Sequence, residues 1–201
     1  MIKNQIRIEE FKSLREEMLK WQERRFEVLK IALLTSSAIV TGSIAKSDAW
    51  ESSLAIAAVL FVLGISARLI RLFATFTAAG GSYLEVFFDS EWEKRNRLRL
   101  SMRYSNKELS SIPTLNQTFT WVLFGIALVS AVVCYSLAKK PSLFSVFFVL
   151  VPAALFFLVN AYYLYNKSYP RKELVDRWLA LSGTEIGEFL KFNNYQMSRR
   201  M

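Results

Sequence analysis

Four long apolar blocks separated by charged segments dominate the hydropathy pattern of this chain. They cover residues 31–45, 52–67, 119–138 and 142–165. A helix that crosses a bilayer needs about 20 mostly apolar residues, and the short first block approaches this length when residues 26–30 are added. The pattern therefore predicts an all-α, polytopic membrane protein with about four transmembrane helices. Helical N-terminal, middle and C-terminal segments are expected outside the membrane.

The charged N-terminal segment is predicted to be a helix over residues 6–30, because it lacks Gly and Pro and is rich in strong helix formers. Apolar side chains recur along one face at spacings of three and four residues, and Val28 continues the row after an interruption at Arg25. This coiled-coil-like seam either rests against the bilayer or the protein itself, or joins copies of the chain. The candidate oligomerisation residues are Phe11, Leu14, Met18 and Trp21.

The first apolar block differs from the others because it carries many hydroxyl and small residues between Thr35 and Ser43. Such residues either let membrane helices pack closely or line a water-accessible path. In the second case, hydroxyls would line a pore and apolar side chains would form a gate that closes by dewetting. The candidate pore and gate residues of this block are Leu33, Leu34, Thr35, Ile39, Val40 and Thr41.

Two further pore candidates, Arg68 and Arg71, follow the second block, and apolar character then resumes as far as Gly80 and Gly81. An arginine that faces lipid deep in a bilayer is costly, so we expect the helix to leave the membrane at Arg68. The alternative places both arginines deeper, as a basic ring at the inner mouth of a pore. The glycine pair predicts a break in this helix.

The middle segment contains a predicted basic helix in which Arg95, Arg99 and Arg103 share one face. Basic clusters beside a membrane commonly contact anionic lipid headgroups. Arginine also binds phosphate through its planar fork, and nearby Trp92 and Tyr104 would let the face hold a nucleotide or a single-stranded oligonucleotide by stacking. The candidate ligand-binding residues, for phosphate or a lipid headgroup, are Lys94, Arg95, Arg97, Arg99 and Arg103.

The later part of the chain is predicted to form a second transmembrane hairpin and a helical tail. The fourth block contains Pro152, which membrane helices tolerate when neighbours satisfy the freed carbonyl. The tail helix is expected to begin at Pro170 and to end near Gly183. The predicted organisation is a cytoplasmic helix, a hairpin, a basic segment, a second hairpin and a cytoplasmic tail, at residues 1–30, 31–79, 80–117, 118–166 and 167–201.

Basic residues are distributed unevenly around the four predicted spans. Of the 26 Lys and Arg residues, the two predicted outer loops hold Lys46, Lys139 and Lys140, and all the others fall in the N-terminal, middle and C-terminal segments when Arg68 and Arg71 are counted with the middle one. Cytoplasmic loops carry the excess of positive charge in membrane proteins. We therefore expect a multi-pass protein of the bacterial inner membrane, in contact with its lipids and with both termini in the cytoplasm.

The residue types present exclude several kinds of chemistry. The chain has no His and one Cys, Cys134, so a Cys/His zinc site and a His-based catalytic triad are excluded within one chain. The sequence has no Gly-rich phosphate loop or nucleophile motif. No predicted span has a central Asp, Glu or Lys of the kind that pumps and proton relays use. We therefore expect no enzyme, metal or cofactor, and only passive transport.

The order of elements resembles that of a known class of membrane protein. A charged helix containing the run WQERR, Trp21–Arg25, enters a small-residue span, and a second span leads into a basic cytoplasmic helix. Over roughly the first 105 residues this layout resembles the SLATT-type membrane proteins, which are predicted pore-forming effectors of nucleotide-signalled bacterial immunity. The third and fourth spans depart from the two-span SLATT pattern, and the whole plan is similar to the four-span membrane effector of Hailong-type anti-phage systems.

The resemblance implies a homo-oligomeric channel, with a tetramer as the working expectation, that is closed at rest and depolarises the inner membrane during phage infection. It further implies control by a cytoplasmic nucleotide or oligonucleotide signal, made by a nucleotidyltransferase system. The alternative is a non-conducting membrane scaffold or sensor that recruits a cytoplasmic partner through its basic surface.

Overall fold

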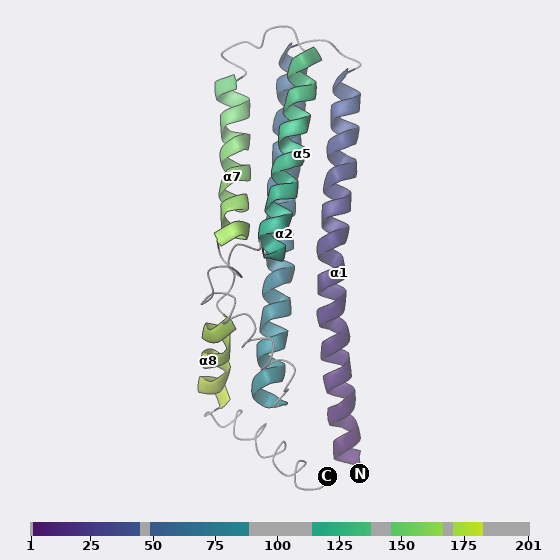
Figure 1. The fold of residues 1–201 in the computed structure, drawn as a ribbon, viewed down its shortest axis with the longest axis vertical. Coiled ribbons are helices and arrows are strands. Elements are labelled where there is room, and N and C mark those ends of the chain that lie inside the picture. The colour runs from purple at the N-terminus through teal and green to yellow at the C-terminus, as the bar shows by residue number, and fades with distance from the viewer. Residues whose placement is uncertain (1, 45–48, 89–113, 138–145, 167–170, 183–201) are drawn as a thin grey trace. The chain divides into compact units, whose positions relative to one another are not determined.

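The computed structural model describes residues 2–44, 49–88, 114–137, 146–166 and 171–182, and the predicted all-α class is confirmed (Figure 1). Every regular element in these ranges is helical. They are α1 (Ile2–Ile44), α2 (Ala49–Phe87), α5 (Leu115–Leu137), a π-helical turn (Val146–Leu150), α7 (Val151–Asn166) and α8 (Arg171–Ser182).

Four of these helices are long and apolar enough to cross a membrane, which confirms the number of spans predicted from hydropathy. The helical stretches are Ile8–Ser43, Ser52–Phe87, Leu115–Cys134 and Phe148–Asn166. They indicate a multi-pass membrane protein. The π-helical turn ends at Leu150, two residues before Pro152. A proline inside a helix lacks the N–H for the usual bond and its ring collides with the carbonyl four residues earlier, and a wider π turn is one way to accommodate this.

The chain divides into two compact units. The bundle unit comprises Arg24–Leu72 and Pro113–Ser168, and the terminal unit comprises Met1–Glu23, Phe73–Ile112 and Tyr169–Met201. Helices α1 and α2 each contribute one part to each unit. In the bundle unit the stretches of α1, α2, α5 and the segment ending in α7 are each about 20 residues long, which is the length that a bilayer requires.

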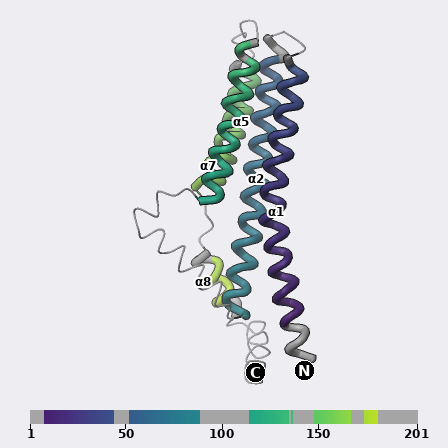
Figure 2. Tube along the Cα trace, turned by 45° about the vertical axis from the view of Figure 1, so that its right-hand side comes forward, coloured from purple at the N-terminus to yellow at the C-terminus, as the bar shows by residue number. Residues whose placement is uncertain are grey.

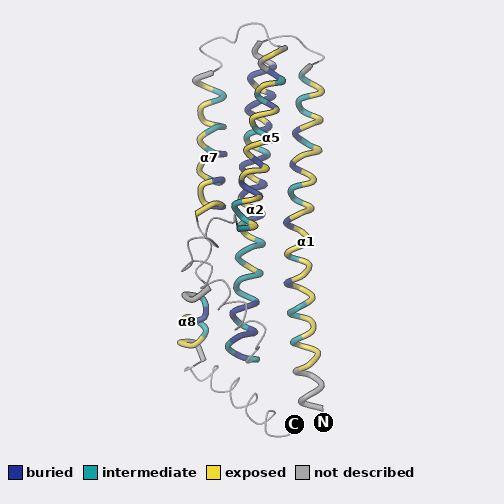
Figure 3. Tube along the Cα trace, viewed as in Figure 1, coloured by how far each residue is buried: buried dark blue, intermediate teal, exposed yellow. Residues whose placement is uncertain are grey.

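The core of the bundle unit is made of side chains from all four stretches (Figure 3). Ala32, Leu63, Leu123 and Leu164 represent α1, α2, α5 and α7 in it, and all four are fully buried. A smaller cluster joins Cys134 of α5 to Ala55 and Ile56 of α2, and the Cys134 sulfur lies 3.7 Å from the hydroxyl oxygen of Ser43.

A glycine allows α2 and α7 to approach closely in the bundle unit. A Cβ atom at Gly64 would lie 2.6 Å from two ring atoms of Phe156, and that ring is stacked on Phe61 with centroids 4.9 Å apart. Real Cβ atoms do not come so close to other heavy atoms, so Phe156 occupies the space that only glycine leaves. Such use of small residues is typical of helix packing in membranes.

In the terminal unit, the N-terminal seam packs against α2 of the same chain. The ring centroids of Trp21 and Phe76 are 5.4 Å apart, and those of Phe11 and Phe88 are 5.8 Å apart. Met18 is buried. These contacts correspond to the predicted alternative in which the seam rests on the protein itself, and association of the seam with other copies stays a prediction.

The predicted helix break at Gly80 and Gly81 is wrong, because α2 continues through both residues to Phe87. A Cβ atom at Gly80 would lie 3.1 Å from Cγ of Met18. The glycine therefore serves a close approach of two helices, and the energy of this packing outweighs the roughly 1 kcal/mol that a glycine costs inside a helix.

Helix α8 belongs to the terminal unit and packs on the end of α2. Trp178 meets the rings of Tyr83 and Phe87 edge-on, at centroid distances of 5.3 and 6.0 Å, and Val175 is buried. The predicted tail helix is confirmed, with Ser182 as its last residue immediately before Gly183.

Candidate functional site

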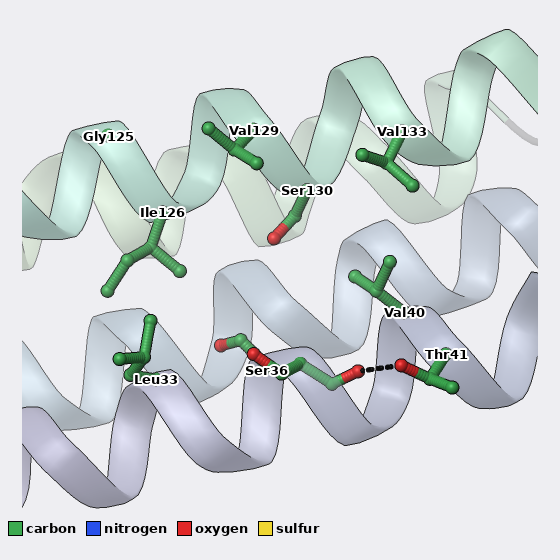
Figure 4. Close-up of a pocket in the computed structure, with 10 residues that line it drawn as sticks. Leu33, Ser36, Val40, Thr41, Gly125, Ile126, Val129, Ser130 and Val133 are labelled. Carbon is green, nitrogen blue, oxygen red and sulfur yellow. Dashed lines mark hydrogen bonds between the residues drawn. The ribbon is translucent and has the colours of Figure 1, made fainter.

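A hydroxyl-lined groove between α1 and α5 is the best candidate site in the bundle unit (Figure 4). Its volume is about 390 Å³. Two helical stripes, one from each helix, form its walls, because residues three and four apart share a face of a helix. The residues that line this hydroxyl groove are Leu33, Ser36, Ser37, Val40 and Thr41 of α1 with Gly125, Ile126, Val129, Ser130 and Val133 of α5.

Ser36 is the unusual residue of the hydroxyl groove. It is only 1% exposed, and its Oγ atom has no hydrogen-bond partner. Other hydroxyls in these helices bond to a carbonyl one turn back, as Thr41 does to Ser37 and Ser66 does to Val62, both at 2.8 Å. An unsatisfied buried hydroxyl costs about 1–3 kcal/mol. A water molecule in the hydroxyl groove would supply the missing partner once the side chains that cover the Ser36 Oγ atom move aside.

The geometry around Ser36 suits water. Ser130 extends its hydroxyl from α5 toward α1 on the same side of the groove (Figure 4). A cavity of about 390 Å³ exceeds by about tenfold the volume that one water molecule occupies in the liquid. Four of the ten lining residues carry a hydroxyl, and polar partners together with sufficient room are the two conditions for bound water. No Asp, Glu, Lys or Arg side chain lines the groove, so its walls carry no fixed charge.

The predicted pore residues of the first block separate into two groups. Leu33, Val40 and Thr41 line the hydroxyl groove. Ile39, which does not line the groove, packs against both core clusters, as Val40 also does, and Leu34 is 69% exposed. Thr35 is half-buried and does not line the groove.

Neither predicted pore arginine of α2 lines the hydroxyl groove. The guanidinium carbon of Arg71 lies 5.0 Å from the ring centroid of Tyr163, which is a cation–π contact with α7. Arg68 is exposed. Both arginines precede Leu72, the last residue of α2 in the bundle unit, and the helix continues past them without a break. Exit from the membrane at Arg68 stays a prediction.

Sequence reasoning missed Arg25, which it treated as an interruption of the seam. Arg25 is only 6% exposed, donates a hydrogen bond from its Nη2 to Oδ1 of Asn116, and lies 5.2 Å from the ring centroid of Phe119. Its Nε atom has no hydrogen-bond partner. Arg25 therefore connects α1 to the beginning of α5 through a hydrogen bond and a cation–π contact. The signal available in the sequence was that Arg25 lies four residues after Trp21 and three before Val28, on the same face of the helix as the apolar seam.

Sequence reasoning also missed the α5 wall of the hydroxyl groove. The third block was treated as a plain span, although Gly125 and Ser130 in it lie on the stripe that faces α1. No Cβ at Gly125 would have a neighbour within 4 Å, so the glycine widens the groove.

The predicted basic ligand-binding residues lie outside the described residues; they are Lys94, Arg95, Arg97, Arg99 and Arg103. The predicted oligomerisation residue Leu14 is described, and it is half-buried on the seam of the terminal unit. Within the described ranges, no group of three or more His, Cys, Asp or Glu side chains is arranged to hold a metal ion.

Comparisons with known proteins give no match: no protein-family model, no curated protein and no solved structure is similar to this chain. The functional argument therefore depends on the groove, the buried polar groups and the charge pattern.

Proposed function

We propose that the protein is a passive, homo-oligomeric membrane channel in which the hydroxyl groove forms part of the ion path. The unpartnered, buried Ser36 hydroxyl is the observation that carries this proposal. In a bilayer no lipid tail can satisfy such a hydroxyl, whereas water in a polar groove can. Leu33, Val40 and Val133 supply apolar walls that would interrupt a continuous column of water and keep the path closed at rest, while single water molecules can still occupy the polar positions.

The length of the hydroxyl groove explains why an assembly is needed. On α1 it extends from Leu33 to Thr41, which is about 12 Å at a rise of 1.5 Å per residue. The hydrocarbon core of a bilayer is about 30 Å thick. One groove therefore covers less than half of a membrane crossing, and the remainder must come from movement of α1 or from neighbouring copies. Ile31 and Leu34, which are 62% and 69% exposed, leave part of α1 uncovered in one copy.

The biological setting of the proposal is bacterial anti-phage defence. The channel would open in response to a cytoplasmic nucleotide or oligonucleotide from a nucleotidyltransferase system and depolarise the inner membrane. The charge pattern supports an orientation in which the N-terminal, middle and C-terminal segments face the cytoplasm, where the signal would be, since basic residues concentrate in these segments. The basic cluster between Lys94 and Arg103 is the proposed ligand surface, because arginine binds phosphate through its forked donors. Absence of charge in the groove supports passive conduction.

Ion flux from liposomes tests the channel and its path together. Purified protein is reconstituted, and potassium efflux is measured with and without nucleoside triphosphates and short single-stranded oligonucleotides. We expect ligand-dependent efflux that Gly125→Phe abolishes, because the new ring fills the hydroxyl groove. Gly42→Phe is the matched control, since Gly42 also has open space around it but does not line the groove.

The outcomes separate the two candidate functions. Efflux that survives Gly125→Phe unchanged would show that ions take another path. Absence of efflux under every ligand, together with a stable monomer in detergent, would contradict the channel and favour the scaffold. The packing of the N-terminal seam on α2 is the observation that favours a scaffold, because the face predicted for self-association is already in use in the terminal unit.

A further inference from the structure

The buried charge of Arg25 lies in the same line of contact between α1 and α5 as the hydroxyl groove. In the bundle unit, α1 and α5 run in the same direction (Figure 2). Arg25 contacts Asn116 and Phe119 at the beginning of α5. Near the end of α5, the Cys134 sulfur lies 3.7 Å from the hydroxyl oxygen of Ser43. Along both helices, the hydroxyl groove therefore lies between a charged contact and a neutral one.

The helical register aligns Arg25 with the polar positions of the hydroxyl groove. Ser36 comes eleven residues after Arg25, and Ser130 comes eleven residues after Phe119. At 3.6 residues per turn, this spacing is close to three full turns, so each pair shares one face of its helix. Ser36 and Ser130 line the groove from opposite walls. The pair of Arg25 and Phe119 thus belongs to the same seam, about 17 Å further along it at a rise of 1.5 Å per residue.

The contacts described for Arg25 leave its positive charge without a negative partner. A guanidinium stays protonated at physiological pH. Asn116 offers an amide oxygen and Phe119 offers a ring face, and neither side chain is charged. The Nε atom of Arg25 is buried and has no hydrogen-bond partner. Since no charged side chain lines the hydroxyl groove, a path that follows this seam takes its fixed charge from Arg25.

We propose that Arg25 determines the ion preference of the path and favours anions over cations where the hydroxyl groove extends toward the beginning of α5. This inference rests on the proposed channel. The groove is too short to cross a membrane, and movement of α1 away from α5 lengthens it along the seam as far as Arg25. The guanidinium then leaves Asn116 and Phe119 and faces the passing ions. Rings of arginine select anions in pores, because a fixed positive charge attracts anions and repels cations.

The test measures the reversal potential of the full-length protein in planar bilayers that separate two concentrations of potassium chloride. Nucleoside triphosphates and short single-stranded oligonucleotides are the ligands added. The reversal potential gives the permeability ratio of chloride to potassium, which should exceed one for the wild type. Potassium still crosses, so potassium efflux from liposomes remains a valid measure of conduction. Arg25→Met should lower the ratio at least about fivefold, the influence of one unit charge on another about 4 Å away in water.

Two control variants separate the charge of Arg25 from its packing. Arg24→Met removes an equal charge from the adjacent position, where the side chain is exposed, and should leave the permeability ratio unchanged. Arg25→Lys keeps the charge but loses the forked donors that suit Asn116. It should retain the wild-type ratio, even where the weaker contact lowers stability. A role confined to packing would instead make Arg25→Lys resemble Arg25→Met.

The outcomes distinguish failure of this inference from failure of the channel. An unchanged ratio in Arg25→Met, or an equal decrease in Arg24→Met, would overturn the role of Arg25 while conduction remains. A wild-type ratio below one, or equal decreases in Arg25→Lys and Arg25→Met, would overturn it as well. Absence of current from the wild type under every ligand would contradict the channel itself, and the inference would fall with it.

Discussion

The guanidinium of Arg25 lies over the ring of Phe119 while the same side chain donates a hydrogen bond to Asn116. One residue of α1 thus contacts two residues on one face of α5. Within the part of the chain that the structure describes, no carboxylate is paired with Arg25. A buried charge without an ionic partner is expensive, so the amide and the ring provide the compensation that it receives.

Removal of Asn116 should therefore cost more than removal of Arg25 itself. Asn116→Ala leaves the buried cation with one partner fewer, and we expect a loss of about 1.5–3 kcal/mol, typical of a hydrogen bond to a charged group. Arg25→Met keeps most of the volume without the charge and should cost less. Thermal unfolding in detergent measures both changes, and the double variant should resemble Arg25→Met. A larger loss for Arg25→Met than for Asn116→Ala would contradict this account.

Glycine substitutions should have opposite effects at two positions of the bundle unit. Gly64→Ala forces its new Cβ toward Phe156, and overpacking of this kind costs about 1–3 kcal/mol. Gly125→Ala meets nothing within 4 Å and should gain up to about 1 kcal/mol of helix propensity. Urea or thermal unfolding compares the two. Adding Phe156→Leu should recover stability in the Gly64→Ala background, and failure to do so would show that the close approach does not limit packing.

Helices were predicted correctly where a local sequence pattern determines the structure. The prediction was wrong where a contact between distant residues determines it. Hydropathy defined the four spans, and the start and stop signals at Pro170 and Gly183 predicted the tail helix. The glycine pair at Gly80 has the local signature of a break, but Met18 lies 62 positions earlier in the chain and its contact with Gly80 is not visible in a window of residues. The long-range contact with Met18 therefore explains why the helix continues through a glycine pair that usually marks a break.

The candidate site was half predictable for the same reason. Leu33, Val40 and Thr41 were found because the first block is visibly rich in hydroxyls. The α5 wall was missed because Ser130 is a single hydroxyl in an otherwise apolar span, and only the packing of α5 against α1 gives it a meaning. Arg25 was misjudged because a charge in an apolar row usually signals exposure, whereas Asn116 and Phe119 keep this one buried.

The proposed dewetting gate should respond to polarity at groove positions alone. Val40→Ser adds a hydroxyl to the hydroxyl groove, lowers the barrier to wetting, and should raise the basal efflux of potassium from liposomes at least severalfold. Ile31→Ser is the control, because Ile31 belongs to the same helix but does not line the groove. Equal leakage through both variants would mean that disturbance of α1, rather than wetting, causes the flux.

Docking of α8 in the terminal unit should depend on Trp178. Trp178→Ala removes the edge-on contacts with Tyr83 and Phe87, and loss of a large aromatic residue from a packed site costs about 3–5 kcal/mol at most. We expect faster amide hydrogen exchange throughout Arg171–Ser182. Leu179→Ala alters a half-exposed neighbour and should leave exchange nearly unchanged. Unaltered exchange in Trp178→Ala would show that other contacts hold the helix.

Cys134 gives this protein a chemical reporter without any engineering. Its thiol is the only one in the chain and is buried where α5 meets Ser43 of α1. Because Cys134 also packs against Ala55 and Ile56 of α2, a maleimide small enough to enter the bilayer can reach the sulfur only after α5 separates from α1 or α2. The labelling rate in intact cells therefore reports how often these contacts of α5 open, and a rise during phage infection is expected if the proposed channel opens then.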